Sequence, residues 1–188
     1  MRREIRITGM GGQGAITIAR ILGRAAALHD DKEVAITEDY SPYVTGGWSR
    51  GDIVISEEPI DYPRVFSLDG LLTMYQNGLD SNAALVNPKG VILAESRLVD
   101  SSHDRSGKRI LSLPAMATAE NLGRKVLMNV VLLGSLVATT SAVSVGSIRS
   151  AVSEEFPKMS ELNLRALNAG FDLAKYHDHE AHPRLRRF

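Results

Sequence analysis

The stretch RITGMGGQGAITIARILGR, residues 6–24, decides how the chain begins to fold. It places Gly9, Gly11, Gly12 and Gly14 between a short apolar run and a long helical pattern. Three of these glycines have the spacing G-x-G-x-x-G, which has meaning where a strand precedes it and a helix follows. Both conditions hold here, so we predict a Rossmann-like strand–turn–helix unit.

Each glycine of such a turn has its own physical role. One can adopt the positive φ of a tight turn, another lets a phosphate or carboxylate approach the backbone, and a third lets the helix pack on the strand. The free N–H groups at the helix start favour an anion, to which Gln13 could add a side-chain amide. Two interpretations stay open: a bound anionic ligand, or close packing of strand and helix alone.

The pattern of the remaining chain predicts a single three-layer α/β domain with a mostly parallel sheet and C-terminal helices. The helix over residues 15–28 should bury Ile18, Ile21, Leu22 and Ala25. We expect strands over residues 4–8, 34–37, 48–56, 68–74, 84–86, 91–94 and 109–113. The motif NPKG, residues 87–90, should form the turn between two of them. Further helices should cover residues 115–122, 126–138, 147–156 and 161–175, within a domain spanning 1–176 and followed by a polar tail over 177–188.

The composition excludes several classes of protein. Lys and Arg total 22, as do Asp and Glu, and this zero net charge argues against a nucleic-acid binder. The chain has no cysteine, so it can hold no iron–sulfur cluster by its own thiolates, which fits a cytoplasmic protein. Residues 127–145 are uncharged, but their Asn, Gly, Ser and Thr favour a buried core helix over a membrane span.

Neither a metal site nor a catalytic group is predicted. His177, His179 and His182 lie in the expected tail, where a solvated terminus is favoured over a metal site because no rigid element presents the ligands. Ser102, His103 and Asp104 are adjacent, and adjacent side chains point apart instead of forming a triad.

Four segments in this order resemble one known family. They are GMGGQGAITIARILGRAAAL (9–28), EDYSPYVTGGWSRGDIVISEEPIDYP (38–63), NVVLLGSL (129–136) and ELNLRALNAGFDLA (161–174). Together they resemble the gamma subunit of 2-oxoacid:ferredoxin oxidoreductases. This module also occurs fused in single-chain pyruvate:ferredoxin oxidoreductase and as the smaller subunit of indolepyruvate oxidoreductase. The resemblance covers nearly all of the chain up to residue 176.

The resemblance implies a role within a complex. Such complexes decarboxylate a 2-oxoacid on thiamine diphosphate and Mg²⁺, pass electrons to iron–sulfur clusters and ferredoxin, and form an acyl-CoA. Thiamine lies between alpha- and beta-type subunits, and the clusters belong to a ferredoxin-like subunit. This chain is then a structural subunit of a homo- or hetero-oligomer, inactive alone, that helps to wall the CoA site. The segment EPIDYP, residues 58–63, favours 2-oxoglutarate over pyruvate.

The resemblance also implies a set of ligand-contacting residues and shows where this chain departs from the family. The implied cofactor-binding residues are Gly9, Gly11, Gly12, Gln13, Gly14, Tyr40, Ser41, Gly46 and Gly47. Thr45 stands where the family usually has arginine, and Ser41 where glycine is common. The sequence LDG, residues 68–70, lacks the downstream asparagine of the family's magnesium–diphosphate motif.

Two alternatives remain beside this interpretation. The first is a stand-alone NAD(P)-binding Rossmann oxidoreductase, in which Gly9, Gly11 and Gly14 hold the pyrophosphate and Glu38 or Asp39 holds the ribose. The second is a non-catalytic adaptor that kept the fold and lost the complex, as the missing arginine would allow.

Overall fold

The computed structural model describes the backbone of residues 2–42 and 47–181, with side chains up to residue 177. Its centre is a six-stranded sheet in the order β2-β3-β1-β4-β5-β6. The pairs β1–β4, β4–β5 and β5–β6 are parallel, whereas β3 is antiparallel to both of its neighbours. The prediction of a mostly parallel sheet is therefore confirmed. The strands are β1 (Arg2–Met10), β2 (Glu33–Tyr40), β3 (Trp48–Ser56), β4 (Leu68–Thr73), β5 (Val86–Glu95) and β6 (Arg109–Leu113).

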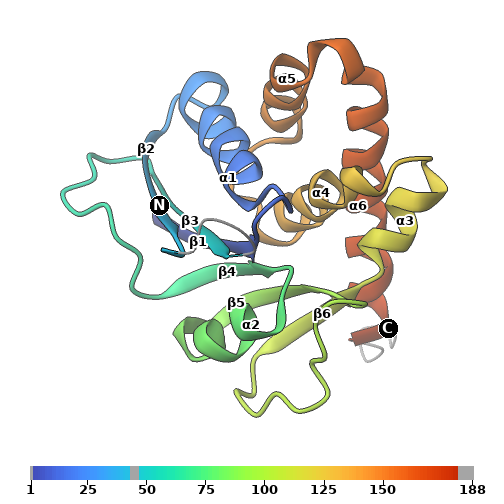
Figure 1. Cartoon of the computed structure of the whole chain (residues 1–188). Coiled ribbons are helices and arrows are strands. Elements are labelled where there is room, and N and C mark those ends of the chain that lie inside the picture. Colours follow the sequence, from blue (N-terminus) through green and yellow to red (C-terminus); the bar gives the residue numbers. More distant parts are fainter. Residues whose placement is uncertain (1, 43–46, 182–188) are drawn as a thin grey trace, which may run out of the picture.

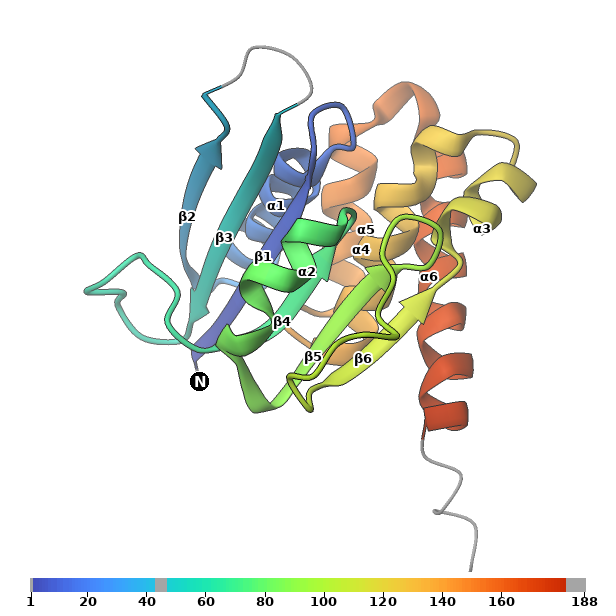
Figure 2. The same ribbon diagram turned by 60° about the horizontal axis from the view of Figure 1, so that its bottom comes forward.

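Helices cover the sheet unequally on its two faces. The helices are α1 (Ala15–Arg24), α2 (Gln76–Asn82), α3 (Ala115–Asn121), α4 (Met128–Thr140), α5 (Val145–Glu155) and α6 (Ser160–Ala181). Figure 1 shows α1, α4, α5 and α6 together above one face, and α2 on the opposite side. Figure 2 shows the short α2 alone in front of β1 and β4. The three-layer arrangement is thus confirmed, with one thick and one thin helical layer.

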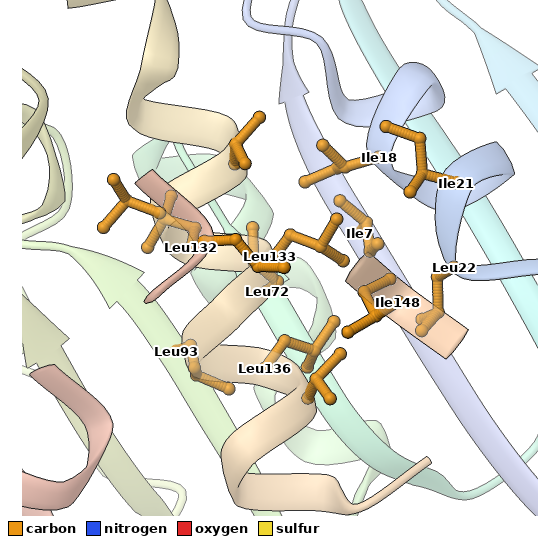
Figure 3. Packing of buried hydrophobic residues seen from close by; sticks show 14 of the residues in the cluster. Ile7, Ile18, Ile21, Leu22, Leu72, Leu93, Leu132, Leu133, Leu136 and Ile148 are labelled. Atoms are coloured by element: carbon orange, nitrogen blue, oxygen red, sulfur yellow. The ribbon is translucent and has the colours of Figure 1, made fainter. Parts of the chain in front are cut away.

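The main core lies between the sheet and the thick helical layer. Figure 3 shows Ile7 of β1 and Leu72 of β4 facing Leu133 of α4 and Ile18 of α1. The four residues predicted for the buried face of the first helix are each 0% exposed. That helix continues through a π-helical turn (Ala25–His29), so its predicted extent to residue 28 is confirmed.

Helix α4 is the uncharged segment that was long enough to raise the question of a membrane. Nearly all of its residues are buried, because α1, α3 and α6 surround it above the sheet. A helix that is apolar all round is typical of a protein core. Within the described part of the chain, none of the helices has both the length and the apolar character needed to cross a bilayer.

Two expectations about local structure are wrong. The NPKG motif does not turn the chain back, because Leu68 pairs with Val86 and Gly70 with Val91 in one parallel ladder. The motif is therefore an extra loop within β5, and residues 83–85, before it, form a 3-10 turn. The last helix does not end at residue 175, because α6 continues to Ala181.

Candidate functional site

The glycine turn joins the end of β1 to the start of α1, as predicted. Gly12 has φ +85° and Gly14 has φ +78°, and both values favour glycine. Gly14 precedes the first turn of α1, and its carbonyl accepts the hydrogen bond from Ile18 N at 3.1 Å. A side chain at Gly14 would also meet the amide of Asn129, which lies on α4 and is 9% exposed.

Gly9 and Gln13 shape this turn from within. Gln13 Oε1 accepts a hydrogen bond from Met10 N at 2.7 Å, and Gln13 Nε2 donates to Met74 O at 3.2 Å. The predicted amide is thus used to tie the turn to the end of β4. A Cβ atom at Gly9 would lie 3.0 Å from Met74 Cε and 3.3 Å from Ala15 Cβ, so this glycine permits close packing.

A cavity of about 480 Å³ opens beside the turn, and we call it the glycine-turn cavity. It brings the turn together with the end of β2 and the start of β3. The backbone closes this junction, because Gly11 N donates to Gly47 O at 2.7 Å and Ser41 N donates to Trp48 O at 2.8 Å. The cavity is lined by Gly11, Gly12, Gly14, Ala15, Ile16, Thr17, Tyr40, Ser41, Gly47, Trp48 and Ser49. Of the predicted ligand contacts, Gly9 and Gln13 do not line it, and Gly46 lies outside the described residues.

The charge around the glycine-turn cavity favours an anion. Its described lining contains no Asp, Glu, Lys or Arg. The start of α1 lies in its wall, and a helix N-terminus carries a partial positive charge and N–H donors. The arrangement can therefore accept a phosphate or carboxylate through the backbone.

The two acids that could have held a nucleotide ribose are already engaged. Arg20 Nε and Nη2 donate to both carboxylate oxygens of Glu38 at 2.6 and 2.7 Å, and Tyr40 Oη donates to Glu38 at 2.9 Å. The hydrogen bond from Arg20 holds the pKa of Glu38 below its usual value, because it outweighs burial, which raises this pKa. Asp39 is paired with Arg50. Moreover, in the sheet that the described residues form, antiparallel β3 separates β2 from β1, whereas a dinucleotide-binding unit places its first two strands side by side and parallel.

Sequence reasoning missed a buried polar cluster on the face that α2 covers. Arg6 of β1 donates through Nε and Nη2 to Asp52 of β3, both at 2.7 Å, and through Nη1 to Asn82 Oδ1 at 2.6 Å. Arg6 is only 7% and Asp52 only 5% exposed. The available signal was a charged residue between Ile5 and Ile7, which implies that the opposite face of β1 is polar.

A second cavity, of about 390 Å³, adjoins this cluster. Arg6, Trp48, Arg50 and Tyr75 contribute to its wall, and Trp48 lines the glycine-turn cavity as well. Burial raises the pKa of the Tyr75 phenol, and the nearby Arg50 opposes this only in part. Trp48 therefore separates two cavities near the carboxyl end of β1, one toward each face of the sheet.

Comparison with known proteins identifies the family. The model of the pyruvate ferredoxin/flavodoxin oxidoreductase family matches residues 4–173. The chain belongs to this family. Among its relatives, the 2-oxoglutarate synthase subunit KorC of Methanocaldococcus jannaschii is 39% identical, over 93% of this chain and 95% of that protein. The resemblance drawn from the sequence motifs is confirmed.

Solved structures of this oxidoreductase family show the same fold. The keto/oxoacid ferredoxin oxidoreductase gamma subunit of Geobacter sulfurreducens PCA has a TM-score of 0.81 and 32% identity, over 93% of this chain and 99% of that one. The 2-oxoglutarate:ferredoxin oxidoreductase from Magnetococcus marinus has a TM-score of 0.83 at 22% identity, and this chain corresponds to 31% of it. The protein is thus a gamma subunit of a 2-oxoacid:ferredoxin oxidoreductase.

Proposed function

We propose that this gamma subunit completes a cytoplasmic complex that oxidises 2-oxoglutarate, and that its glycine-turn cavity helps to hold coenzyme A. In the proposed reaction the 2-oxoacid loses CO₂, two electrons pass to ferredoxin, and the remaining acyl group forms a thioester with CoA. Relatives named 2-oxoglutarate synthase subunits support the choice of substrate. The observation that carries the role of this chain is the anion-accepting cavity at the start of α1.

Thiamine diphosphate and its Mg²⁺ do not fit the residues present here. Asp69 of the LDG sequence accepts hydrogen bonds from Glu4 N at 2.8 Å and Asn87 Nδ2 at 3.1 Å, and pairs with Arg3 Nη1 at 3.4 Å. Its carboxylate is therefore committed within this chain. Among the described side chains, no group of His, Asp or Glu is arranged to hold a metal ion. We place thiamine on alpha- and beta-type subunits and the iron–sulfur clusters on a ferredoxin-like subunit.

The chemical groups of coenzyme A suit those that line the glycine-turn cavity. When bound, it supplies the thiol that accepts the acyl group. Gly11 and Gly12 let a phosphate approach the backbone, and the first N–H groups of α1 can donate to it. The rings of Tyr40 and Trp48 offer apolar surface beside that position. In this proposal the chain binds and orients CoA, and partner subunits carry out the oxidation.

Assembly is tested by activity. The purified chain alone should not oxidise 2-oxoglutarate, and co-expression with thiamine-binding and cluster-binding subunits from the same host should produce CoA-dependent reduction of ferredoxin. Pyruvate assayed in parallel tests the choice of substrate. Full turnover by the isolated chain would contradict the proposal.

The CoA contact is tested by one matched pair of variants. Gly12 has open space around it, and both Asp and Asn tolerate a positive φ. In the reconstituted complex, Gly12→Asp should raise the KM for CoA about tenfold through charge repulsion, with kcat little changed. Gly12→Asn has the same shape without the charge and should have a much smaller effect. Equal KM values for the two variants would place the CoA phosphates elsewhere.

A further inference from the structure

A third cavity, of about 480 Å³, lies at the opposite end of the sheet, near the amino ends of the parallel strands. We call it the amino-edge cavity. Arg3 lies near the start of β1 and Arg109 at the start of β6, whereas the glycine-turn cavity follows the carboxyl end of β1. The amino-edge cavity is lined by Arg3, Asp69, Asn87, Pro88, Lys89, Val91, Arg109, Thr139 and Thr140. Nothing in the proposed function uses it.

The charge of the amino-edge cavity is positive. Arg3, Lys89 and Arg109 face it with Asp69 as the one carboxylate among its described lining. Asp69 accepts the three hydrogen bonds described above and keeps its single negative charge, so the cationic side chains of the described lining outnumber the anionic ones by three to one. The C-terminal end of α4, at Thr139 and Thr140, adds a partial negative charge that offsets only part of the surplus.

Arg3 retains unused hydrogen-bonding capacity. Arg6 and Arg20 each use the Nε and Nη2 edge of the guanidinium to hold a carboxylate by two bonds. Arg3 donates to Asp69 through Nη1, at 3.4 Å, and its buried Nε has no partner among the described residues. A buried donor without an acceptor is unfavourable, so an oxyanion that this guanidinium turned to hold would stabilise it.

The NPKG loop presents the second cation. Asn87 donates to Asp69, and its Oδ1 accepts from Lys89 N at 2.9 Å, which fixes the loop that interrupts the β4–β5 ladder. Gly90 fits under this loop because a side chain there would lie 2.6 Å from Leu68 O. Lys89 is held on the wall of the cavity, and in the described part of the chain its ammonium forms no ion pair.

We propose that the amino-edge cavity is a binding site for a small phosphorylated compound, with Arg3 and Lys89 as its principal contacts. Its volume lies within the range of small-molecule sites and exceeds that of a simple inorganic anion. A guanidinium edge and an ammonium on different elements suit a phosphate with several oxygen atoms. This site is separate from the CoA contact, so the two proposals can fail independently.

The test uses the purified full-length chain and pyrophosphate as the probe, measured by calorimetry at constant ionic strength. Pyrophosphate should bind with a defined stoichiometry, and Lys89→Met should weaken binding about tenfold or more. Lys89→Arg should retain most of the affinity. Lys158→Met, which removes a lysine that does not line the cavity, should bind as the unaltered chain does.

Each outcome decides the proposal. Loss in Lys89→Met with retention in Lys89→Arg and Lys158→Met supports it. Undiminished binding by Lys89→Met overturns it, because the ion then occupies another place such as the glycine turn. No binding at millimolar pyrophosphate also overturns it, and would leave the cations to contact carboxylates of a neighbouring subunit.

Discussion

Gly14 and Gly12 share a positive φ but differ in what surrounds them. A side chain at Gly14 would meet Asn129, whereas nothing lies within 4 Å of a Cβ at Gly12. Gly12→Ala should therefore lower the free energy of unfolding by the backbone strain alone, about 1–2 kcal/mol. Gly14→Ala adds overpacking and should cost about 2–4 kcal/mol.

Urea denaturation of the two alanine variants measures this difference. Because Gly12→Ala carries the same kind of backbone strain, it is the control for the contact with Asn129. Equal losses would show that the α4 side chain moves away freely. The turn would then depend on its φ angles alone.

The Arg6–Asp52 pair is buried, and burial sets its energetic role. Asp52→Asn leaves the Arg6 guanidinium without its bidentate anion in a site that is 7% exposed. Removing one partner of a buried pair costs about 3–5 kcal/mol. The Arg97–Glu120 pair has the same 2.7 Å separation but is exposed, so Glu120→Gln should cost less than about 1 kcal/mol. Similar losses in chemical denaturation for both variants would contradict this assignment.

At the scale of elements, Asp30 fastens the first helical segment to the start of α5. Its carboxylate accepts hydrogen bonds from Ser144 N at 2.7 Å and Ser147 Oγ at 2.6 Å, while Ser144 caps α5. Burial raises the pKa of Asp30, but the hydrogen bonds from Ser147 and Ser144 together outweigh it, so the pKa lies below the usual 3.8. The carboxylate thus stabilises the fold fully above that pH, and this contribution is lost as the pH falls through the lower folded-state pKa.

Asp30→Asn should therefore lower the free energy of unfolding by about 1 kcal/mol at neutral pH. The difference from the unaltered chain should shrink as the pH is lowered below 3.8, where the native carboxyl begins to protonate. Urea denaturation across this acidic range measures it. Asp172→Asn, at a side chain that is 79% exposed, is the matched control and should show little loss at any pH. A loss for Asp30→Asn that does not depend on pH would refute the role of its charge.

Local patterns predicted most elements, and long-range pairing explains the errors. The spacing of Ile18, Ile21 and Leu22 predicted the first helix and its buried face because both depend on neighbours along the chain. NPKG resembles a turn locally, but both flanks pair with β4 in one direction. The insertion of antiparallel β3 between β1 and β2 also depends on contacts between distant residues. Each half of the glycine-turn cavity is a local motif, so the sequence indicated both halves. The salt bridge of Arg6 with Asp52 joins distant residues, and the sequence did not predict it.

At the scale of the whole molecule, the two ends of the sheet differ in chemistry. The carboxyl end of β1 leads into a cavity without charged side chains in its described lining, and the amino ends of the strands border a cationic one. The elements between them form a continuous apolar core from α1 to α6. A ligand that binds at either end should therefore raise the free energy of unfolding of the whole domain, and ligands for the two ends can be tested one at a time.

Nicotinamide nucleotides provide the last test at this scale. The dinucleotide alternative needs a free acid on a strand next to β1. The neighbours of β1 are β3 and β4, and Glu38 and Asp39 lie on β2, where Arg20 and Arg50 hold them. A ligand at a hundred times its Kd would stabilise the native chain by about 2.7 kcal/mol and raise the Tm by several degrees. We expect NAD⁺ and NADP⁺ at millimolar concentration to leave the Tm where sodium chloride of equal ionic strength leaves it. A saturable rise in Tm, abolished by Gly12→Asp but not by Gly12→Asn, would instead place a dinucleotide phosphate on the glycine turn.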